Sequence, residues 1–224
     1  MSEFTVHAAL ADQLALRLDR TVKALNKNRF DACWVKTKEE ALALIRDTLP
    51  KGAVVSNGGS MTLEECGVME LLRSGDYDFL DRAAVPREEQ GAIYRKAFSA
   101  DYFLMSSNAI TENGELYNVD GNGNRVAALI FGPEHVIVLA GANKLVPDVN
   151  AAVSRVKRTA APANTLRLHC DTPCAQTGCC AGAKGDLPAG CLSEQRICCQ
   201  YVVSGYQRVP GRIKVILVAE SLGY

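Results

Sequence analysis

The sequence predicts an α/β sandwich, with a largely parallel sheet covered by helices on both faces. Segments that read as strands alternate along the chain with segments that read as helices, and several of the strands are apolar throughout. Residues 135–141, His-Val-Ile-Val-Leu-Ala-Gly, form the most apolar of them. Strands without polar alternation are typical of parallel sheets buried on both faces. At 224 residues, with no repeat or linker, the chain is expected to form a single domain over residues 1–224.

The individual elements follow from periodicity and end signals. Leu10, Leu14 and Leu18 continue a stripe that begins at Val6 and predicts a long amphipathic helix. Thr37 with Glu40, and Thr62 with Glu65, have the spacing of capping boxes. We expect helices over residues 6–25, 38–49, 62–73, 86–98 and 147–161. We expect strands over residues 31–35, 53–57, 101–107, 135–141 and 212–220, with a short extended piece at 77–81. Residues 114–120 and 125–131 flank the Gly-Asn-Gly-Asn turn in a hairpin pattern.

Charge and hydropathy exclude some classes of function. The 25 basic and 25 acidic residues cancel and are spread along the chain, so nothing favours nucleic acid as a partner. No run is long and apolar enough to predict a membrane span, and the acidic, amphipathic N-terminal stretch is unlike a secretory signal. We therefore expect a cytoplasmic protein whose thiols stay reduced.

Cysteine is concentrated late in the chain. Six of the nine cysteines lie between residues 172 and 199, within a Gly-rich stretch that we expect to be an insertion at about 169–200, before the last strand. The odd total excludes complete internal pairing, and the expected compartment disfavours disulfides. A metal site, redox chemistry and plain packing remain as explanations.

Two polar segments are candidates for a ligand cleft. The strand at 53–57 runs into Gly58, Gly59 and Ser60, where backbone can approach a ligand closely, although a tight strand-to-helix turn explains the pattern equally well. Residues 106–125 are dense in polar side chains, among them Glu112 as a candidate base or nucleophile and Arg125 as a partner for a carboxylate or phosphate. Lys144 follows the strand at 135–141 and is a candidate partner for an anion.

Several long motifs together resemble the LUD domain of lactate-utilisation proteins, including its stand-alone bacterial members. They include VSNGGSMTLEECGV, ADYFLMSSNAITENGELYNVDGNGNRVAALIFGP and VIVLAGANKLVPD, and they extend over nearly the whole chain. The resemblance implies a three-layer α/β/α sandwich like that of ribose-phosphate isomerases and CoA transferases. It also implies an association with lactate oxidation beside iron–sulfur proteins. The ligand-binding residues that this fold implies are Gly58, Gly59, Ser60, Thr62, Asn108, Asp120, Asn124, Arg125 and Lys144, with Glu112 as the catalytic candidate.

The cysteines also resemble a pattern in stand-alone relatives, PCxxTGxCxxC followed by SPxRICN. The matching positions, which the resemblance implies as metal ligands, are Cys174, Cys180, Cys191 and Cys198. Cys179 and Cys199 fall outside the pattern, and the inserted AGAKGDLPAG displaces the third position. Four thiolates suit a [4Fe–4S] cluster or a zinc ion, and reduced thiols in a loop are the remaining alternative.

Three functions stay open on this basis. The first is a redox-associated protein of lactate or related 2-hydroxy-acid metabolism, binding a small anionic or a CoA- or phosphate-bearing ligand and working with an electron-transfer partner. The second is a non-catalytic module that senses a metabolite or redox state through a structural metal site. The third is an isomerase- or transferase-like enzyme that uses Glu112. Self-association as a homo-oligomer is compatible with each of them.

Overall fold

The computed structural model describes residues 6–224, with side chains from residue 7 onward, and contains two sheets. The first residues of the expected N-terminal segment lie outside that range. The strands are β1 (Asp31–Val35), β2 (Val54–Asn57), β3 (Asp78–Phe79), β4 (Tyr102–Met105), β5 (Ala109–Thr111), β6 (Leu116–Asp120), β7 (His135–Gly141), β8 (Leu145–Val146), β9 (Gln200–Ser204) and β10 (Ile213–Val218). The α-helices are α1 (Val6–Lys27), α2 (Lys38–Thr48), α3 (Met61–Glu65), α4 (Val68–Leu72), α5 (Gln90–Lys96), α6 (Asn124–Phe131), α7 (Val149–Arg155), α8 (Ala161–Arg167) and α9 (Pro173–Thr177).

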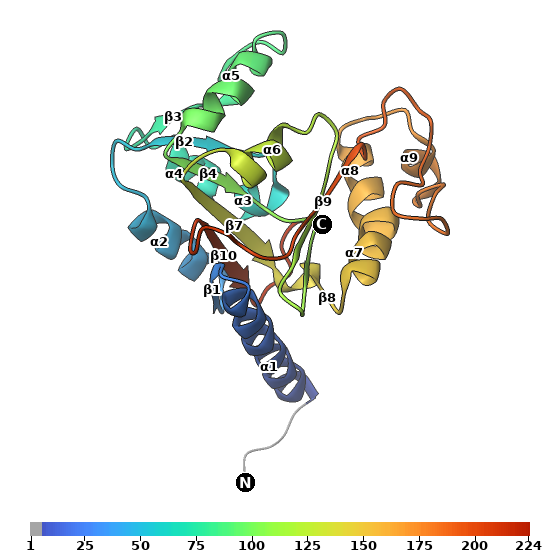
Figure 1. Ribbon diagram of the computed structural model, residues 1–224, viewed down its shortest axis with the longest axis horizontal. Helices are drawn as coiled ribbons and strands as arrows, with labels where there is room; N and C mark the ends of the chain where they lie inside the picture. The colour runs from blue at the N-terminus through green and yellow to red at the C-terminus, as the bar shows by residue number, and fades with distance from the viewer. Residues whose placement is uncertain (1–5) are drawn as a thin grey trace.

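The larger sheet has the order β1-β10-β7-β4-β2-β3, and all its pairs are parallel. Strand β7 shows why it is apolar throughout. Val136, Val138 and Ala140 pack against α1 and α6, whereas Ile137 and Leu139 pack against α2, α3 and α4 on the other face. Figure 1 shows the sheet between these helices. The expected three-layer sandwich is therefore confirmed.

The smaller sheet has the order β8-β5-β6-β9 and mixes parallel and antiparallel pairs. One face contributes Ile110 and Leu116 to the core under α1. The other face packs Tyr117 and Val119 against α7 and α8. Helices α7 and α8 and the cysteine-rich segment lie together at one side of the molecule (Figure 1).

Four expectations about local structure need correction. Residues 124–131 form helix α6 rather than the second strand of a hairpin. Its apolar run fits either structure, and the Asp120 carboxylate decides the outcome by accepting hydrogen bonds from the backbone N–H groups of Arg125 and Val126. The helix expected at 62–73 is divided at Gly67 (φ 70°), and Ser60 is its N-cap instead of Thr62.

The other two corrections concern the C-terminal half. The helix that begins at Val149 continues beyond residue 161, through a π-helical turn (η4, Val156–Ala160) and then α8. The chain leaves the cysteine-rich segment into β9 of the smaller sheet, and only then reaches β10. The segment is thus tied at both ends to elements that border the smaller sheet.

Gly114 offers a test of how the smaller sheet is joined to α1. It has φ +85°, and a Cβ atom there would lie 2.6 Å from the backbone carbonyl carbon of Ala24 in α1. Gly52 has a similar φ of +79° with nothing within 4 Å of its Cβ position. We expect Gly114→Ala to lower the free energy of unfolding by on the order of 3 kcal/mol, against about 1 kcal/mol for Gly52→Ala. Urea denaturation measures both values, and equal losses would show that the contact with α1 is unimportant.

Candidate metal centre and adjoining cleft

The residues after three neighbouring strands of the larger sheet meet at one edge. Because β2, β4 and β7 are parallel neighbours, their carboxyl ends lie side by side. Ser60 follows β2, Ser106 follows β4, and Lys144 follows β7 in a 3₁₀ turn (η3, Ala142–Lys144). These residues line one side of a cleft of about 1170 Å³. This volume exceeds the range of about 300–1,000 Å³ that is usual for ligand sites.

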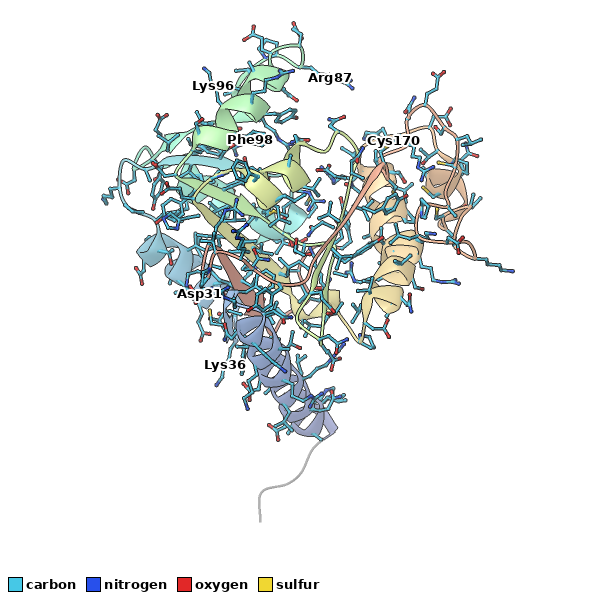
Figure 2. The ribbon with its side chains drawn as sticks, in the orientation of Figure 1. Asp31, Lys36, Arg87, Lys96, Phe98 and Cys170 are labelled. Carbon is cyan, nitrogen blue, oxygen red and sulfur yellow. The ribbon has the colours of Figure 1, made fainter. Side chains whose placement is uncertain are left out.

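The opposite sides of this cleft come from distant parts of the chain. Arg82 and Arg87 belong to the segment before α5, and Arg167 and Cys170 belong to the end of α8 and the following turn. Figure 2 shows Arg87 and Cys170 on facing sides of the cleft. The cationic residues that line it are Arg82, Arg87, Arg125, Lys144, Arg167 and Arg196, whereas its acidic residues are Asp120 and Glu194. The Asp120 carboxylate is occupied by backbone N–H groups. The cleft is therefore suited to an anionic ligand.

Arg125 organises the inner wall of the cleft. Its Nη1 donates to the Asn118 side-chain oxygen (2.6 Å) and the Ser106 carbonyl (3.2 Å). Its Nη2 donates to the Asn108 side-chain oxygen (3.0 Å) and the Val119 carbonyl (2.8 Å). A Cβ atom at Gly58 would lie 2.8 Å from Cδ of Arg125, so glycine is required for the strand turn to pack against this side chain. Burial lowers the pKa of Arg125, but the guanidinium stays charged.

The structure brings together most of the ligand-binding residues that the sequence predicted. Those that line the cleft are Gly59, Ser60, Asn108, Asp120, Asn124, Arg125 and Lys144. Gly58 and Thr62 lie behind its surface, where Gly58 packs under Arg125 and the Thr62 hydroxyl accepts a hydrogen bond from Lys144. No signal in the sequence predicted Arg82, Arg87 or Arg167, because isolated arginines in unrelated segments have no characteristic spacing.

Glu112 is the predicted site residue that lies apart from the cleft. It follows β5 at the end opposite to Asn108, and its carboxylate pairs with Arg17 of α1 (2.6 Å) and Arg20 (3.5 Å). It is absent from the residues that line the cleft described above. These contacts give Glu112 a role in joining the smaller sheet to α1.

A substitution tests this assignment of Glu112. We expect Glu112→Gln to lower the free energy of unfolding by less than about 1 kcal/mol, because the ion pair with Arg17 is partly exposed. Binding of ligands in the cleft should be unchanged. Urea denaturation and calorimetric titration measure the two effects. If Glu112→Gln has wild-type stability but no longer binds a ligand, Glu112 belongs to the binding site.

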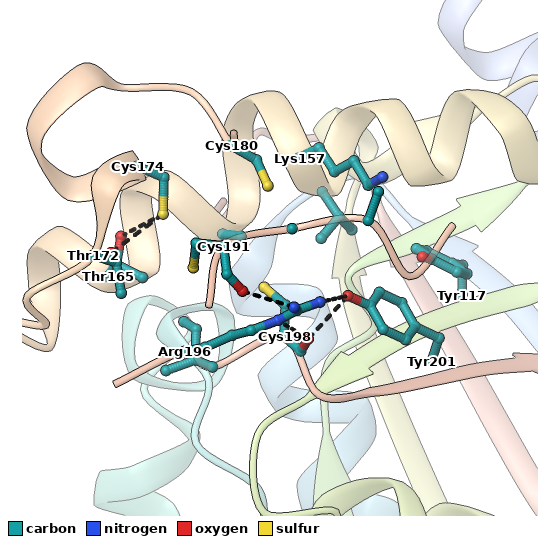
Figure 3. A pocket seen from close by; sticks show the side chains of 15 residues that line it. Tyr117, Lys157, Thr165, Thr172, Cys174, Cys180, Cys191, Arg196, Cys198 and Tyr201 are labelled. Carbon is teal, nitrogen blue, oxygen red and sulfur yellow. Dashed lines mark hydrogen bonds between the residues drawn. The ribbon is translucent and has the colours of Figure 1, made fainter. Parts of the chain in front are cut away.

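The four matching cysteines line a second, narrow cavity beside the cleft. Cys174 comes from α9, Cys180 and Cys191 from the loop after it, and Cys198 from the approach to β9. Figure 3 shows their sulfur atoms pointing toward one another. Cys179 lines neither cavity, and Cys170 and Cys199 line the cleft. The cysteines that line the cavity are thus the four that match the pattern of the stand-alone relatives.

Two buried or partly buried cations hold the backbone that carries these thiols. Lys157 Nζ donates to the carbonyls of Gly182 (2.9 Å), Gly185 (3.3 Å) and Asp186 (2.6 Å). Arg196 donates to the Cys191 and Cys198 carbonyls, each at 2.8 Å (Figure 3). The loop has little regular structure of its own, so these contacts define its path. Neither cation was predicted, although Arg196 lies two residues before Cys198 in the sequence.

The donor set fits a soft metal centre. Thiols are the metal-binding side chains around the cavity, a set preferred by zinc and by iron–sulfur clusters. Thr172 Oγ1 lies 3.3 Å from the Cys174 sulfur, Thr165 Oγ1 lies 3.5 Å from it, and the Gly182 N–H donates to the Cys180 sulfur (3.4 Å). Burial, with the nearby Cys180 and Cys174 thiols, raises the pKa of Cys198 to about 12. This thiol is therefore protonated until a metal displaces the proton.

The dimensions of the cavity limit how a metal would be held. The space between the side chains is about 20 Å³, close to the room taken by one water molecule. Within residues 6–224, no three His, Cys, Asp or Glu side chains are placed to bind a single ion. The thiols thus surround a narrow space without converging on one point. A metal centre would therefore be held only after the loop that carries the thiols rearranges.

The cavity and the cleft share a wall. Both are lined by Val156, Ala161, Arg196, Ile197 and Cys198. A group held by the four thiols would therefore lie directly behind the surface that contacts a ligand.

No helix within residues 6–224 has both the length and the apolar character needed to cross a membrane.

Fold and site together define a three-layer α/β/α domain in which a thiol-lined cavity adjoins a cationic cleft. Residues 18–218 match the LUD domain, and the chain belongs to the LUD domain family. It is similar to a DUF162 family protein from Deinococcus radiodurans, whose crystal structure aligns over 92% of this chain and 98% of that one. The identity is 16% and the TM-score 0.52, so this likeness shows a common fold.

The eIF2B delta protein from Chaetomium thermophilum is a more distant structural match. It is 15% identical over 60% of this chain and 53% of that one, and its TM-score of 0.33 supports no argument. No curated protein matches the chain.

Proposed function

We propose that this LUD domain protein binds an iron–sulfur cluster through four cysteines and an anionic metabolite in the adjoining cleft, and that it acts in the redox metabolism of lactate or related 2-hydroxy acids. The proposed cluster ligands are Cys174, Cys180, Cys191 and Cys198. One observation carries the proposal: four thiols from separate segments line one cavity, which shares a wall with a cationic cleft. The lactate connection rests on membership of the LUD domain family.

The residues around the proposed centre suit electron transfer. A cluster there would accept or donate electrons, and hydrogen bonds to its sulfur ligands tune the potential at which it does so. Thr165, Thr172 and the Gly182 N–H are in position to provide such bonds. Cys170 and Cys199 line the cleft near the wall that it shares with the thiol-lined cavity. The proposed partner at this side of the cleft is an electron-transfer protein.

The residues of the cleft suit a carboxylate or phosphate. The guanidinium groups of Arg82 and Arg87 make no ion pair or hydrogen bond with other residues in the range 6–224, so both are available to an anion. A guanidinium can bind a carboxylate or phosphate through two parallel hydrogen bonds. The volume of the cleft also accommodates a larger ligand such as a CoA ester.

The isomerase- or transferase-like alternative loses support from the same geometry, because Glu112 pairs with Arg17 instead of lining the cleft. The sensing alternative differs from the main proposal in turnover and electron transfer, and it predicts a metal without redox activity.

Anaerobic purification followed by iron and acid-labile sulfide analysis is the decisive test. We expect protein with a broad visible absorption that is bleached by dithionite. Colourless protein containing stoichiometric zinc would support a structural metal site instead, and protein without metal after reconstitution with iron and sulfide would refute the redox part of the proposal.

A further inference from the structure

Lys144 is a buried lysine that faces the cleft. Its exposed fraction is 4%, and its Nζ donates to Thr62 Oγ1 (2.7 Å) and Ser106 Oγ (3.0 Å). Within the described residues 6–224, no carboxylate lies at ion-pair distance from it. An ammonium has three N–H donors, so one remains for a ligand. Burying a lysine without a carboxylate is costly, which points to a chemical role.

Lys157 shows what a structural lysine looks like in the same protein. It is also buried, with an exposed fraction of 5%, but its Nζ donates to three backbone carbonyls. Carbonyls only accept hydrogen bonds, so this site requires the ammonium form. The partners of Lys144 are two hydroxyl oxygens, which donate their own protons to the carbonyls of Leu222 and Ser107. The two N–H groups of a neutral amine are enough to satisfy both oxygens, so this site is compatible with a neutral amine whose lone pair is free.

The surroundings of Lys144 favour that neutral form. Burial, followed by the positive charges of Arg155 and Arg125, lowers its pKa to about 7, against a weaker opposing effect of Glu65 and Cys66. A desolvated lysine beside other cations is an activated nucleophile at neutral pH.

We propose that Lys144 is a nucleophilic amine that captures the carbonyl group of a 2-oxo acid as an imine. In this step Nζ attacks the carbonyl carbon, a C–N bond forms, and the carbonyl electron pair moves to oxygen. The nitrogen then loses its protons, the oxygen leaves as water, and a C=N bond remains. No oxidant or reductant is needed. The inference rests on the proposed function only in treating the cleft as the ligand site.

The cleft explains the choice of a 2-oxo acid over a neutral carbonyl compound. Arg82 lines the cleft without a partner, and its guanidinium lies against Gly59, where a Cβ atom would be 2.4 Å from Nη2. Gly59 precedes Ser60 and Thr62, and the Thr62 hydroxyl contacts Lys144. A carboxylate held on the Arg82 side therefore lies along the same turn as the amine that would receive the adjacent carbonyl.

Borohydride trapping tests the inference on the intact protein. The anaerobically purified protein is incubated with pyruvate and sodium cyanoborohydride, and modified lysines are found by peptide mass spectrometry. We expect the reduced pyruvate adduct on Lys144 at least ten times faster than on the exposed Lys36 and Lys96 (Figure 2). We expect none on Lys157, and faster modification of Lys144 at pH 8 than at pH 6.

The comparison among lysines of one protein needs no variant to fold. An absent adduct, or an adduct on Lys144 formed no faster than on Lys36, overturns the inference. In Lys144→Arg, checked for native circular dichroism, the fast adduct should disappear and the slow surface reaction should remain. Persistence of the fast reaction in that variant equally overturns the assignment.

Failure of this inference can be separated from failure of the proposed function. Trapping is repeated on the same wild-type protein after treatment with an iron chelator, and it should still occur at Lys144. An adduct in protein that binds no iron would leave the inference standing without the redox proposal. Protein that contains iron and sulfide but forms no adduct would support the redox proposal and overturn the inference about Lys144.

Discussion

Iron and visible absorption are expected to disappear when any one of four cysteines is replaced by alanine: Cys174, Cys180, Cys191 or Cys198. A cluster needs every protein ligand in place, and the four thiols occupy one cavity. The loss should also lower stability, because metal binding to the native state stabilises it. Iron and sulfide analysis, the visible spectrum and thermal unfolding of anaerobically prepared variants measure these effects.

Cys179 provides a matched control for this experiment. It is adjacent to Cys180 in the sequence but lines neither the cavity nor the cleft. Cys179→Ala should keep the iron content and spectrum of the wild-type protein. Equal loss of iron in Cys179→Ala and Cys180→Ala would contradict the ligand assignment. If the wild-type protein contains zinc and the same four variants lose it, the ligand assignment is correct and the metal is zinc instead of an iron–sulfur cluster.

Replacing Arg125 by methionine is expected to lower the free energy of unfolding by on the order of 3 kcal/mol and to abolish anion binding in the cleft. Its guanidinium satisfies four oxygen atoms, and among them the side-chain oxygen of Asn118 belongs to a fully buried residue. Without Arg125 the Asn118 side-chain oxygen lies in a low-dielectric wall without a donor, whereas the Asn108 side-chain oxygen keeps the Val119 N–H. Urea denaturation measures the first effect, and calorimetric titration with pyruvate measures the second.

The exposed Arg158 is the matched control, since its side chain makes no hydrogen bond or ion pair within residues 6–224. Arg158→Met should change stability by less than about 0.5 kcal/mol. Arg125→Lys should rescue the variant poorly, because a lysine cannot reach four acceptors in the planar arrangement of a guanidinium. Loss of stability with intact pyruvate binding would limit Arg125 to a structural role.

Local signals predicted much of the fold. The Thr37 cap is present, with its hydroxyl accepting from the Glu40 N–H. The apolar strand at 135–141 lies inside the parallel sheet, as its lack of polar alternation indicated. The same signals failed where two structures share one pattern. Residues 124–131 are apolar enough for a strand or a helix, and the carboxylate of Asp120, just before this segment, decided between them by binding the first N–H groups of the helix.

The candidate site was predictable where the chain itself concentrates the signal. Glycines and polar residues after strands identified the inner wall of the cleft, and a motif resemblance selected four of nine cysteines. Glu112 shows the limit of this reasoning. It lies in the same polar segment as Asn108, yet β5 carries the two residues to opposite ends of a strand, and Arg17 of α1 binds the carboxylate.

Residue type and near-neighbour spacing are enough to predict the alternation of helices and strands, the layers that they form and the thiols available to a metal. The packing of distant segments places the thiol-lined cavity beside the cleft and directs Arg82 and Arg87 toward the cleft. It also buries Lys144 in the wall of the cleft, and it buries Lys157 under the loop that carries the thiols. Burial and the field of neighbouring charges set the chemistry of these groups. Both arise only when segments far apart in the chain pack together.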